Sequence, residues 1–160
     1  MNKYDYLCGA LNKFNKAFKR SLAKTEHTIS GLSKWHLEGD VYTHTMLVVK
    51  HFTHHYYETV SDDDSKILLW SCLLHDVGKP YAVCRRKNKE GKTIQHMSGH
   101  ELISAQIAID FLKTIDLEEQ QKDEIVELVL KHTSAHDITV DNANLSILNE
   151  CDEAGRIFIN

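Results

Sequence analysis

Apolar and polar residues follow each other along most of the chain with the period of a helix. In the first segment, one apolar stripe recurs every three or four positions and lysines lie on the opposite side: Leu7, Leu11, Phe14, Phe18 and Leu22. Such a stripe is typical of an amphipathic α-helix that packs on a core. The pattern predicts helices at about 4–23, 41–59, 65–75 and 145–154, and two more that begin near residues 98 and 116.

The segment 65–75 differs from the other predicted helices because it is apolar on nearly every side. A helix without a polar face is buried all round, so we expect this segment to be the central element of the fold. Ser61 and the acidic run at 62–64 precede it and suit the start of a helix. Pro80 follows it and is expected to stop the helix.

Residues 82–96 have a different composition, since two short runs that favour strands flank Asn88-Lys89-Glu90-Gly91. This arrangement suits a hairpin or flap. Capping boxes are predicted at the start of the two later helices, where Ser98 precedes Glu101 and Asp116 precedes Glu119 by three positions. Residues 25–35 lack a period and are expected to form a loop. The predicted fold class is therefore all-α, a helical bundle with a short β-hairpin or flap near 82–96.

The composition fits one globular domain. A chain of 160 residues with 42% hydrophobic and 26% charged residues is long enough for one core and short for two. We expect a single domain over 1–160, in which 1–35 form a helix and loop that pack on the rest. No apolar run approaches the roughly 18 residues of a membrane span, so no membrane partner is expected. The N-terminus lacks a secretory pattern and the cysteines lack CxxC spacing, which favours a cytoplasmic protein with reduced thiols.

Charge is unevenly distributed along the chain. The net charge of −4 gives the protein as a whole no attraction to nucleic acid. Two stretches are nevertheless basic, and each is explained either as a phosphate-binding patch or as a solvated face. They are Lys13, Lys16, Lys19, Arg20 and Lys24, and Arg85, Arg86, Lys87, Lys89 and Lys92.

The strongest chemical signal is His75-Asp76, at the end of the buried segment. Neighbouring side chains on a helix diverge by about 100°, so an imidazole and a carboxylate converge on one ion only at a helix end. The chain contains 11 histidines, several of which lie where they complete a ligand set. Such ligands favour Mn, Fe, Co, Ni or Zn over Mg or Ca, and two ions about 3.5–4 Å apart polarise a phosphate. The candidate ligands are His44, His75, Asp76, His100, His132 and Asp152.

These residues resemble the H...HD...D pattern of the HD superfamily of metal-dependent phosphohydrolases, in the order His44, His75-Asp76, Asp152. Residues 38–45 and 73–80 are similar to the opening segment and the metal motif of the HD domain of bacterial tRNA nucleotidyltransferases. Gly99-His100-Glu101 fits as well, and residues 128–133 and 151–156 resemble the later His and Asp motifs of HD proteins that carry two metals. The resemblance covers roughly 36–160 and leaves no room for a nucleotidyltransferase head, so CCA addition is not expected.

The resemblance implies a helical bundle and a two-metal site. It implies that one ion is held by His44, His75, Asp76 and Asp152, and that Asp76 bridges to a second ion held by His100 and His132. The implied cofactor is a divalent transition metal, Mn, Fe, Ni, Co or Zn, as two ions, with a hydroxide on the metal as nucleophile.

The implied function is hydrolysis of phosphoester bonds in nucleotides or RNA-end phosphates, as a phosphatase or a 2',3'-cyclic phosphodiesterase. The His100 and His132 pattern also resembles small hydrolases of dinucleoside polyphosphates and nucleotides, and both substrate classes stay open. Asp76 and Lys79 are the predicted catalytic residues. Lys79, Arg85 and Arg86 are the predicted substrate-binding residues.

Each candidate also has a structural interpretation. A histidine at a helix end is often only a partner of the helix dipole, and one metal is the alternative to two. Lys79, the two hairpin arginines and Arg156 are also explained as solvated cations, and Glu101 is better explained by capping than as a general acid. The remaining histidines considered are taken as surface or supporting residues, although His96 and His136 lie near ligands: His36, His51, His54, His55, His96 and His136.

The alternative function is a non-catalytic HD module that binds a nucleotide or a partner protein and uses the metal only structurally. Intact ligand positions count against it, because degenerate modules usually lose the His-Asp pair or the distal Asp. The oligomeric state is left open by the sequence.

Overall fold

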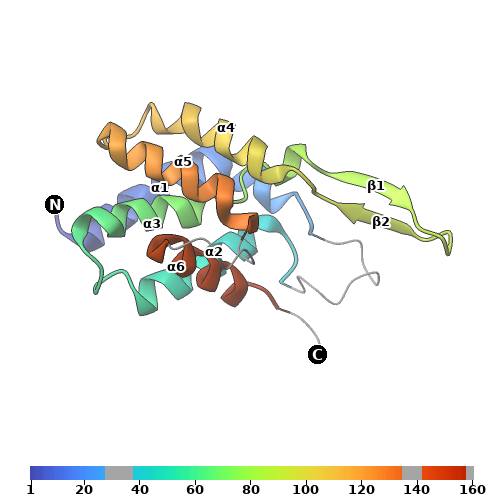
Figure 1. The fold of residues 1–160 in the computed structure, drawn as a ribbon, viewed down its shortest axis with the longest axis horizontal. Coiled ribbons are helices and arrows are strands. Elements are labelled where there is room, and N and C mark those ends of the chain that lie inside the picture. Colours follow the sequence, from blue (N-terminus) through green and yellow to red (C-terminus); the bar gives the residue numbers. More distant parts are fainter. Residues whose placement is uncertain (28–37, 135–141, 158–160) are drawn as a thin grey trace.

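The computed structural model describes residues 1–27, 38–134 and 142–157 of the chain. Within these residues, six α-helices form a bundle and two short strands form a hairpin at one end of it (Figure 1), which confirms the predicted fold class. No helix in these ranges is long and apolar enough to cross a membrane. In chain order the elements are α1 (Lys3–Ala23), α2 (Val41–His55), α3 (Asp62–Leu74), the 3₁₀ helix η1 (Lys79–Tyr81), β1 (Cys84–Lys87), β2 (Thr93–His96), α4 (His100–Leu112), α5 (Glu119–Lys131), the 3₁₀ helix η2 (His132–Ser134) and α6 (Ala143–Ala154).

Helix α3 lies at the centre of the bundle, as predicted from its apolar sequence. It packs against each of the other five α-helices, and every residue from 67 to 74 is buried. Burial of each large apolar side chain contributes roughly 1.5–3 kcal/mol. The indole of Trp70 keeps a partner in this core, since its Nε1–H donates to the hydroxyl of Tyr6 at 2.9 Å. The helix begins at Asp62 rather than at residue 65, because the Ser61 hydroxyl accepts from the Asp64 N–H and caps the first turn.

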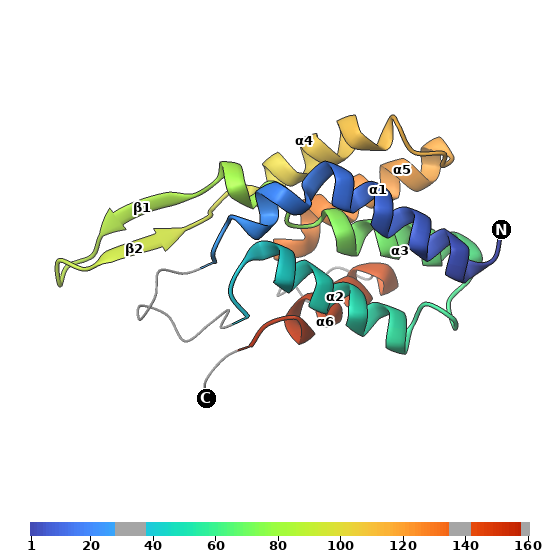
Figure 2. The ribbon, with the colours of Figure 1, turned by 180° about the vertical axis from the view of Figure 1, so that it is seen from behind.

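Helix α1 packs on α2 and α3 (Figure 2). Its side chains Phe14 and Leu22 are fully buried, at 0% exposure. The ammonium of Lys3 donates to the carbonyl oxygens of Tyr57 at 2.7 Å and Val60 at 3.0 Å, which fixes the start of α1 to the segment after α2. The helix predicted at 4–23 is therefore present. Most of the loop predicted at 25–35 lies outside the described residues.

Both capping boxes predicted from sequence are wrong. Helix α4 begins after Gly99, whose φ of +82° is a left-handed conformation that other residues rarely adopt. Because the chain turns at Gly99, Ser98 lies one residue too early to cap, and Glu101 completes no capping box. Helix α5 begins after Glu118 rather than Asp116, and the Glu118 N–H donates to the Gln121 side chain at 2.9 Å.

Other helix boundaries also differ from the sequence prediction. Helix α2 ends at His55 rather than near residue 59, because the Tyr56 and Tyr57 amides both turn back to the carbonyl oxygen of Phe52. Helix α6 begins at Ala143, after the side chain of Asn142 accepts from the Leu145 N–H at 3.1 Å. Pro80 lies in η1, beyond the end of α3, so it follows the stop rather than causing it.

The hairpin predicted near 82–96 is present and projects from the bundle (Figure 1). Its strands pair antiparallel, with Arg85 opposite Gln95 and Lys87 opposite Thr93. The turn is held by Asn88, whose side chain accepts from the Glu90 N–H at 2.9 Å and the Lys92 N–H at 3.0 Å. This local network lets a short ribbon hold its turn without a core of its own.

Candidate metal centre

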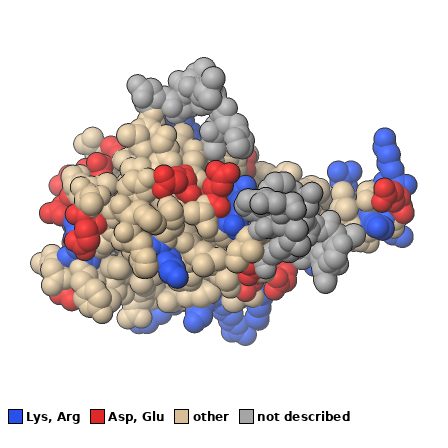
Figure 3. All heavy atoms as spheres, turned by 90° about the horizontal axis from the view of Figure 1, so that it is seen from below, with Lys and Arg blue, Asp and Glu red and all other residues tan. Residues whose placement is uncertain are grey.

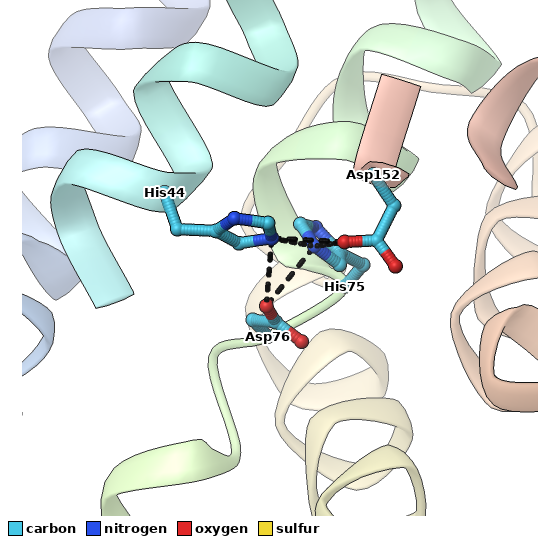
Figure 4. A group of neighbouring side chains, drawn as sticks. All are labelled: His44, His75, Asp76 and Asp152. Atoms are coloured by element: carbon cyan, nitrogen blue, oxygen red, sulfur yellow. Dashed lines mark hydrogen bonds and ion pairs between the residues drawn. The ribbon is translucent and has the colours of Figure 1, made fainter. Parts of the chain in front are cut away.

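The central helix ends at the His-Asp pair. Leu74 is the last residue of α3, His75 caps the helix, and Asp76 lies in the turn that follows. Because the regular helix stops here, the two neighbouring side chains meet instead of diverging (Figure 4), and His75 Nε2 lies 3.1 Å from Asp76 Oδ2. This is the helix end that the sequence predicted.

His44 from α2 and Asp152 from the last turn of α6 form a first cluster with this pair (Figure 4). His44 Nε2 lies 2.8 Å from Asp152 Oδ1 and 3.5 Å from Asp76 Oδ2. His75 Nε2 lies 3.4 Å from Asp152 Oδ1. All four residues are buried, and one ligand atom of each lies within 4.8 Å of the others. The spacing suits a single metal ion with two imidazole and two carboxylate ligands.

A second cluster lies on the other side of the same carboxylate. His100 is the first residue of α4, and His132 caps the end of α5. Asp76 Oδ1 lies 3.1 Å from His100 Nε2 and 3.5 Å from His132 Nε2. Asp76 therefore presents Oδ1 to the second cluster and Oδ2 to the first. The structure brings all six predicted ligands together in two sets that share this one residue.

All four histidines of the clusters are oriented in the same way. In each ring, Nδ1 lies between 2.5 and 3.1 Å from a backbone carbonyl oxygen, which can only accept, so Nδ1 carries the proton. In a neutral ring, Nε2 then has a free lone pair, and each Nε2 points to the centre of its cluster. Histidines that bind metals are commonly held in this way by their second nitrogen. The carbonyls belong to Gly155 for His44, Cys72 for His75, Met97 for His100 and Val129 for His132.

The two buried aspartates stay charged. Burial raises the pKa of Asp76, but the positive charges of His75 and Lys79 outweigh it and hold that pKa well below its usual value. Burial also raises the pKa of Asp152, and hydrogen bonds from His44 and His75 outweigh it in the same direction. Both carboxylates therefore bring negative charge to the centre of the bundle.

This negative charge favours a positive charge between the ligands. Burial lowers the pKa of His75, but the charge of Asp76 and hydrogen bonds with Asp152 and Asp76 outweigh it and raise that pKa to about 10. Asp76 Oδ2, although close to several nitrogens, accepts no well-directed hydrogen bond from any described residue. A divalent cation would meet this oxygen and the inward lone pairs at once. The residues present therefore fit a metal.

Two glycines let the ligand-bearing segments approach each other. A Cβ at Gly78 would meet the backbone N of Ser104 and lie 2.6 Å from the carbonyl oxygen of His100, and the Gly78 N–H donates to the Ser104 hydroxyl at 2.8 Å. The turn after Asp76 thus lies directly against the start of α4. A Cβ at Gly155 would lie 2.6 Å from Val48 Cγ2, so α6 is equally close to α2.

Lys79 lies inside the site rather than in solvent. It is 8% exposed, and its Nζ lies 3.2 Å from Asp76 Oδ2 and 2.9 Å from Nε2 of His27. His27 Nδ1 lies 3.1 Å from the carbonyl oxygen of Gly39, so it donates there and leaves Nε2 to accept from the lysine. The ammonium group is held between an imidazole and the shared carboxylate. The interpretation of Lys79 as a solvated loop lysine is therefore wrong.

A small polar cavity opens beside the second cluster. Its volume is about 170 Å³. Arg156 reaches it from the end of α6, and its Nη2 donates to Asp152 Oδ2 at 3.1 Å. The predicted substrate-binding residues Arg85 and Arg86 do not line it, since both are exposed on β1. The lining residues are Asp76, Lys79, His100, His132, Thr133, Asn149, Asp152, Glu153 and Arg156.

Two residues next to the clusters were missed from the sequence. The side chain of Glu38 is fully buried, with Oε1 3.1 Å from His44 Nδ1 and Oε2 accepting from the Ile157 N–H at 2.9 Å. His27 is the partner of Lys79 described above. Both lie before α2 in segments without a period. Glu38 opens the segment 38–45 that resembles the HD motif, which was the signal that could have found it, whereas no motif included His27.

None of the other candidate histidines that the structure describes lines the cavity, including His96, which the sequence placed near the ligands. On the surface, His51 Nε2 lies 2.8 Å from Glu150 Oε2. His96 lies on β2 away from the lining of the cavity, and its buried Nδ1 has no hydrogen-bond partner among the described residues. His36 and His136 lie outside the described residues.

Comparison with known proteins agrees with this geometry. The family model of the HD domain matches residues 41–157, which include all six cluster residues and exclude α1 and His27. Neither the curated proteins nor the solved structures gave a match. The family match and the buried clusters together support a metal-dependent hydrolase. Because the match covers most of the chain, this protein belongs to the HD domain family.

Proposed function

We propose that this protein is a phosphohydrolase that cleaves phosphoester bonds in nucleotides or RNA-end phosphates, acting as a phosphatase or a 2',3'-cyclic phosphodiesterase. The observation that carries the proposal is the shared carboxylate of Asp76, which faces His44 and His75 with one oxygen and His100 and His132 with the other. Two adjoining ligand sets beside a polar cavity suit hydrolysis of a phosphoester by two metal ions.

The first cluster would hold one divalent transition ion and the second cluster another. When bound, such ions polarise a phosphoryl group and lower the pKa of a water molecule enough to make it a nucleophile near neutral pH. The imidazole ligands favour Mn, Fe, Co, Ni or Zn.

The cations of the chain would bind and orient the phosphate. Lys79 lines the cavity with its ammonium 3.2 Å from Asp76 Oδ2, so it can donate to a nonbridging phosphate oxygen beside the shared carboxylate. Arg156 uses one amino group on Asp152, and its guanidinium has further N–H groups for a second oxygen. Hydrolysis adds the water oxygen to phosphorus and breaks the bond to the leaving oxygen, which takes up a proton.

A substrate and metal panel tests the proposal. The purified protein is assayed with nucleoside mono-, di- and triphosphates, cyclic nucleotides, dinucleoside polyphosphates and RNA with 2',3'-cyclic ends, each in Mn, Ni, Co and Mg. Turnover should require a transition metal and should disappear in Asp76→Ala. Metal bound without turnover on any of these substrates would contradict the proposal and favour a non-catalytic module.

A further inference from the structure

The β1–β2 hairpin carries a concentration of positive charge separate from the metal centre. Residues 82–97 contain five basic side chains and one acidic side chain, a net charge of +4, whereas the whole chain has −4; the rest of the chain therefore carries −8. All five basic side chains are exposed, and none forms an ion pair with a described residue. Figure 3 shows such side chains on the projecting arm. They are Arg85, Arg86, Lys87, Lys89 and Lys92.

Like charges gathered on one short ribbon repel each other. The ribbon buries little apolar surface that would offset this repulsion, because all of β1 is exposed. An anionic partner that lies along the arm would offset this repulsion.

The hairpin is continuous with the metal centre at both ends. β1 begins five residues after Lys79, and β2 ends four residues before His100. The base of the arm is fixed to the bundle, since Gln95 Nε2 donates to the Glu26 carbonyl oxygen at 2.7 Å. Gln95 in turn accepts from Arg85 Nε at 3.0 Å, so the first arginine is held near this base. The arm is therefore joined at both ends to segments that carry a residue lining the cavity, Lys79 before β1 and His100 after β2.

The length of the arm determines the size of that ligand. At about 3.3 Å per residue, the five steps from Cys84 at the start of β1 to Lys89 in the turn extend roughly 16 Å. A single nucleotide bound at the metal centre would reach only the base of the arm. A strand of several nucleotides, with its terminal phosphate in the cavity, would reach the lysines at the tip.

The side chains of the arm suit a phosphate backbone better than bases or lipid. Residues 82–97 contain no Phe, Tyr or Trp on which a base could stack or which could anchor in a membrane. One face of the ribbon is polar throughout, with Arg85 beside Gln95 and Lys87 beside Thr93. Such a surface binds phosphates and sugars without reading sequence.

We propose that the hairpin is a clamp for the backbone of a single-stranded nucleic acid, so that the metal centre acts on the phosphate at the end of a strand in preference to a free nucleotide. This inference rests on the proposed phosphohydrolase function for the reaction, but the binding it requires is measured without turnover.

The binding test compares two triple variants with equal loss of charge. K87Q/K89Q/K92Q removes three lysines from the outer arm, and K13Q/K16Q/R20Q removes three exposed cations from α1. Binding of a fluorescein-labelled 12-nucleotide RNA with a plain 3'-hydroxyl, and of the matching DNA, is measured by anisotropy between 50 and 200 mM salt. The hairpin variant should bind at least tenfold more weakly at 50 mM salt. The slope of the logarithm of the binding constant against the logarithm of salt concentration should also become smaller in magnitude by about 2, since each phosphate contact to a single strand contributes about 0.7. The α1 variant should bind like the unaltered protein.

The activity test uses a mononucleotide and a 12-nucleotide RNA that end in the same phosphate group. In the hairpin variant, the ratio of kcat/KM for RNA to kcat/KM for the mononucleotide should fall about tenfold, through KM. Equal thermal melting of both variants checks that the fold is intact.

Several results would overturn the inference. An equal or greater loss of RNA binding in the α1 variant would place the surface on that helix, and binding to vesicles rich in phosphatidylserine without binding to RNA would assign the arm to lipid. Turnover of nucleotides with no salt-dependent RNA binding would overturn the clamp and leave the phosphohydrolase intact. RNA binding without turnover of any substrate would do the reverse.

Discussion

The two ligand clusters share Asp76 but differ in their surroundings. In the first, the side chains of His44 and His75 are 0% exposed and neither lines the cavity. In the second, the side chain of His100 is 13% exposed, and both His100 and His132 line the cavity. The imidazoles of the first cluster are thus closed inside the bundle and only its carboxylates reach the cavity, whereas both imidazoles of the second cluster face the space where a substrate would bind.

This difference separates two tasks that one site must perform. A closed set with its ligands held on their far sides suits an ion that stays, as in structural zinc sites, whereas an open set suits an ion with a position left for water or substrate. His44 shows the closed arrangement, since its Nδ1 lies near both Glu38 Oε1 and the Gly155 carbonyl oxygen. We therefore expect the first cluster to bind an ion more tightly than the second.

Loss of the shared carboxylate of Asp76 should remove metal binding at both clusters and cause the largest loss of turnover. Asp76→Asn removes the charge that faces all four imidazoles, so we expect turnover to fall by at least about 10³-fold and both ions to be lost. Metal content per chain, measured by mass spectrometry, and turnover check this. Asp110→Asn is the matched control, because it removes an exposed carboxylate on α4 that lies 3.4 Å from Lys113. If Asp76→Asn kept one ion per chain, the clusters would be independent.

A methyl group at Gly78 should separate the clusters by moving one of them. In Gly78→Ala, the new Cβ would press on Ser104 and on the His100 carbonyl oxygen, and relief of that contact would move the start of α4 away from Asp76. Overpacking of this kind costs about 1–3 kcal/mol. Denaturant unfolding should show this loss, and the second cluster should lose its ion while the first keeps one.

The chain offers a matched glycine for this experiment. Gly9 lies in α1, where a Cβ would meet no atom within 4 Å, so Gly9→Ala should stabilise the helix by about 0.5–1 kcal/mol. Equal destabilisation by both substitutions would show that the close contact at Gly78 is not the cause.

Removal of His27 should affect the open side of the site without affecting metal content. His27→Ala takes away the acceptor that holds Lys79 Nζ at 2.9 Å, so the ammonium group loses its fixed position beside Asp76. We expect kcat to fall about tenfold, with smaller change in KM and with unchanged metal content. His27→Gln supplies a side-chain oxygen as a replacement acceptor and should recover part of the loss. Loss of metal in parallel with kcat would contradict a role through Lys79.

The ligands could be predicted from the sequence because they lie near the ends of helices marked by their apolar residues, and because their order resembles a known motif. His75 follows the apolar run of α3, and His132 follows that of α5. The supporting contacts could not be predicted, because they come from segments without a period. Glu38 contacts His44 where the segment before α2 meets the segment after α6. That meeting depends on how segments far apart in the sequence pack together, and not on the spacing of residues along one segment.

The start of α4 also could not be predicted from the residues around it alone. Ser98 and Glu101 have the spacing of a capping box, but Gly99 adopts a left-handed conformation and α4 begins after it. The close contact between Gly78 and Ser104 fixes where that helix must start relative to Asp76. Tertiary contact therefore overrode the local signal at the place where the second cluster is formed.

The metal affinity of the first cluster should depend on pH, because a proton on His75 competes with the ion. This effect should be smaller than those of the substitutions above. Without an ion, the pKa of His75 is about 10, raised from 6.5, so its protonation stabilises the fold fully below about pH 6.5 and this contribution is lost as pH rises through about 10. An ion bound at Nε2 must displace that proton. Apparent affinity of the tighter site for Mn should therefore rise about tenfold per pH unit between pH 6.5 and 8.5, or about 1.4 kcal/mol per unit for one proton.

Calorimetric titration in two buffers of different ionisation enthalpy measures the proton released. His51→Gln, which removes a surface imidazole 2.8 Å from Glu150, should leave the slope unchanged. A pH-independent affinity would mean that His75 is already unprotonated before the ion binds, and the closed cluster would then differ from the open one in access alone.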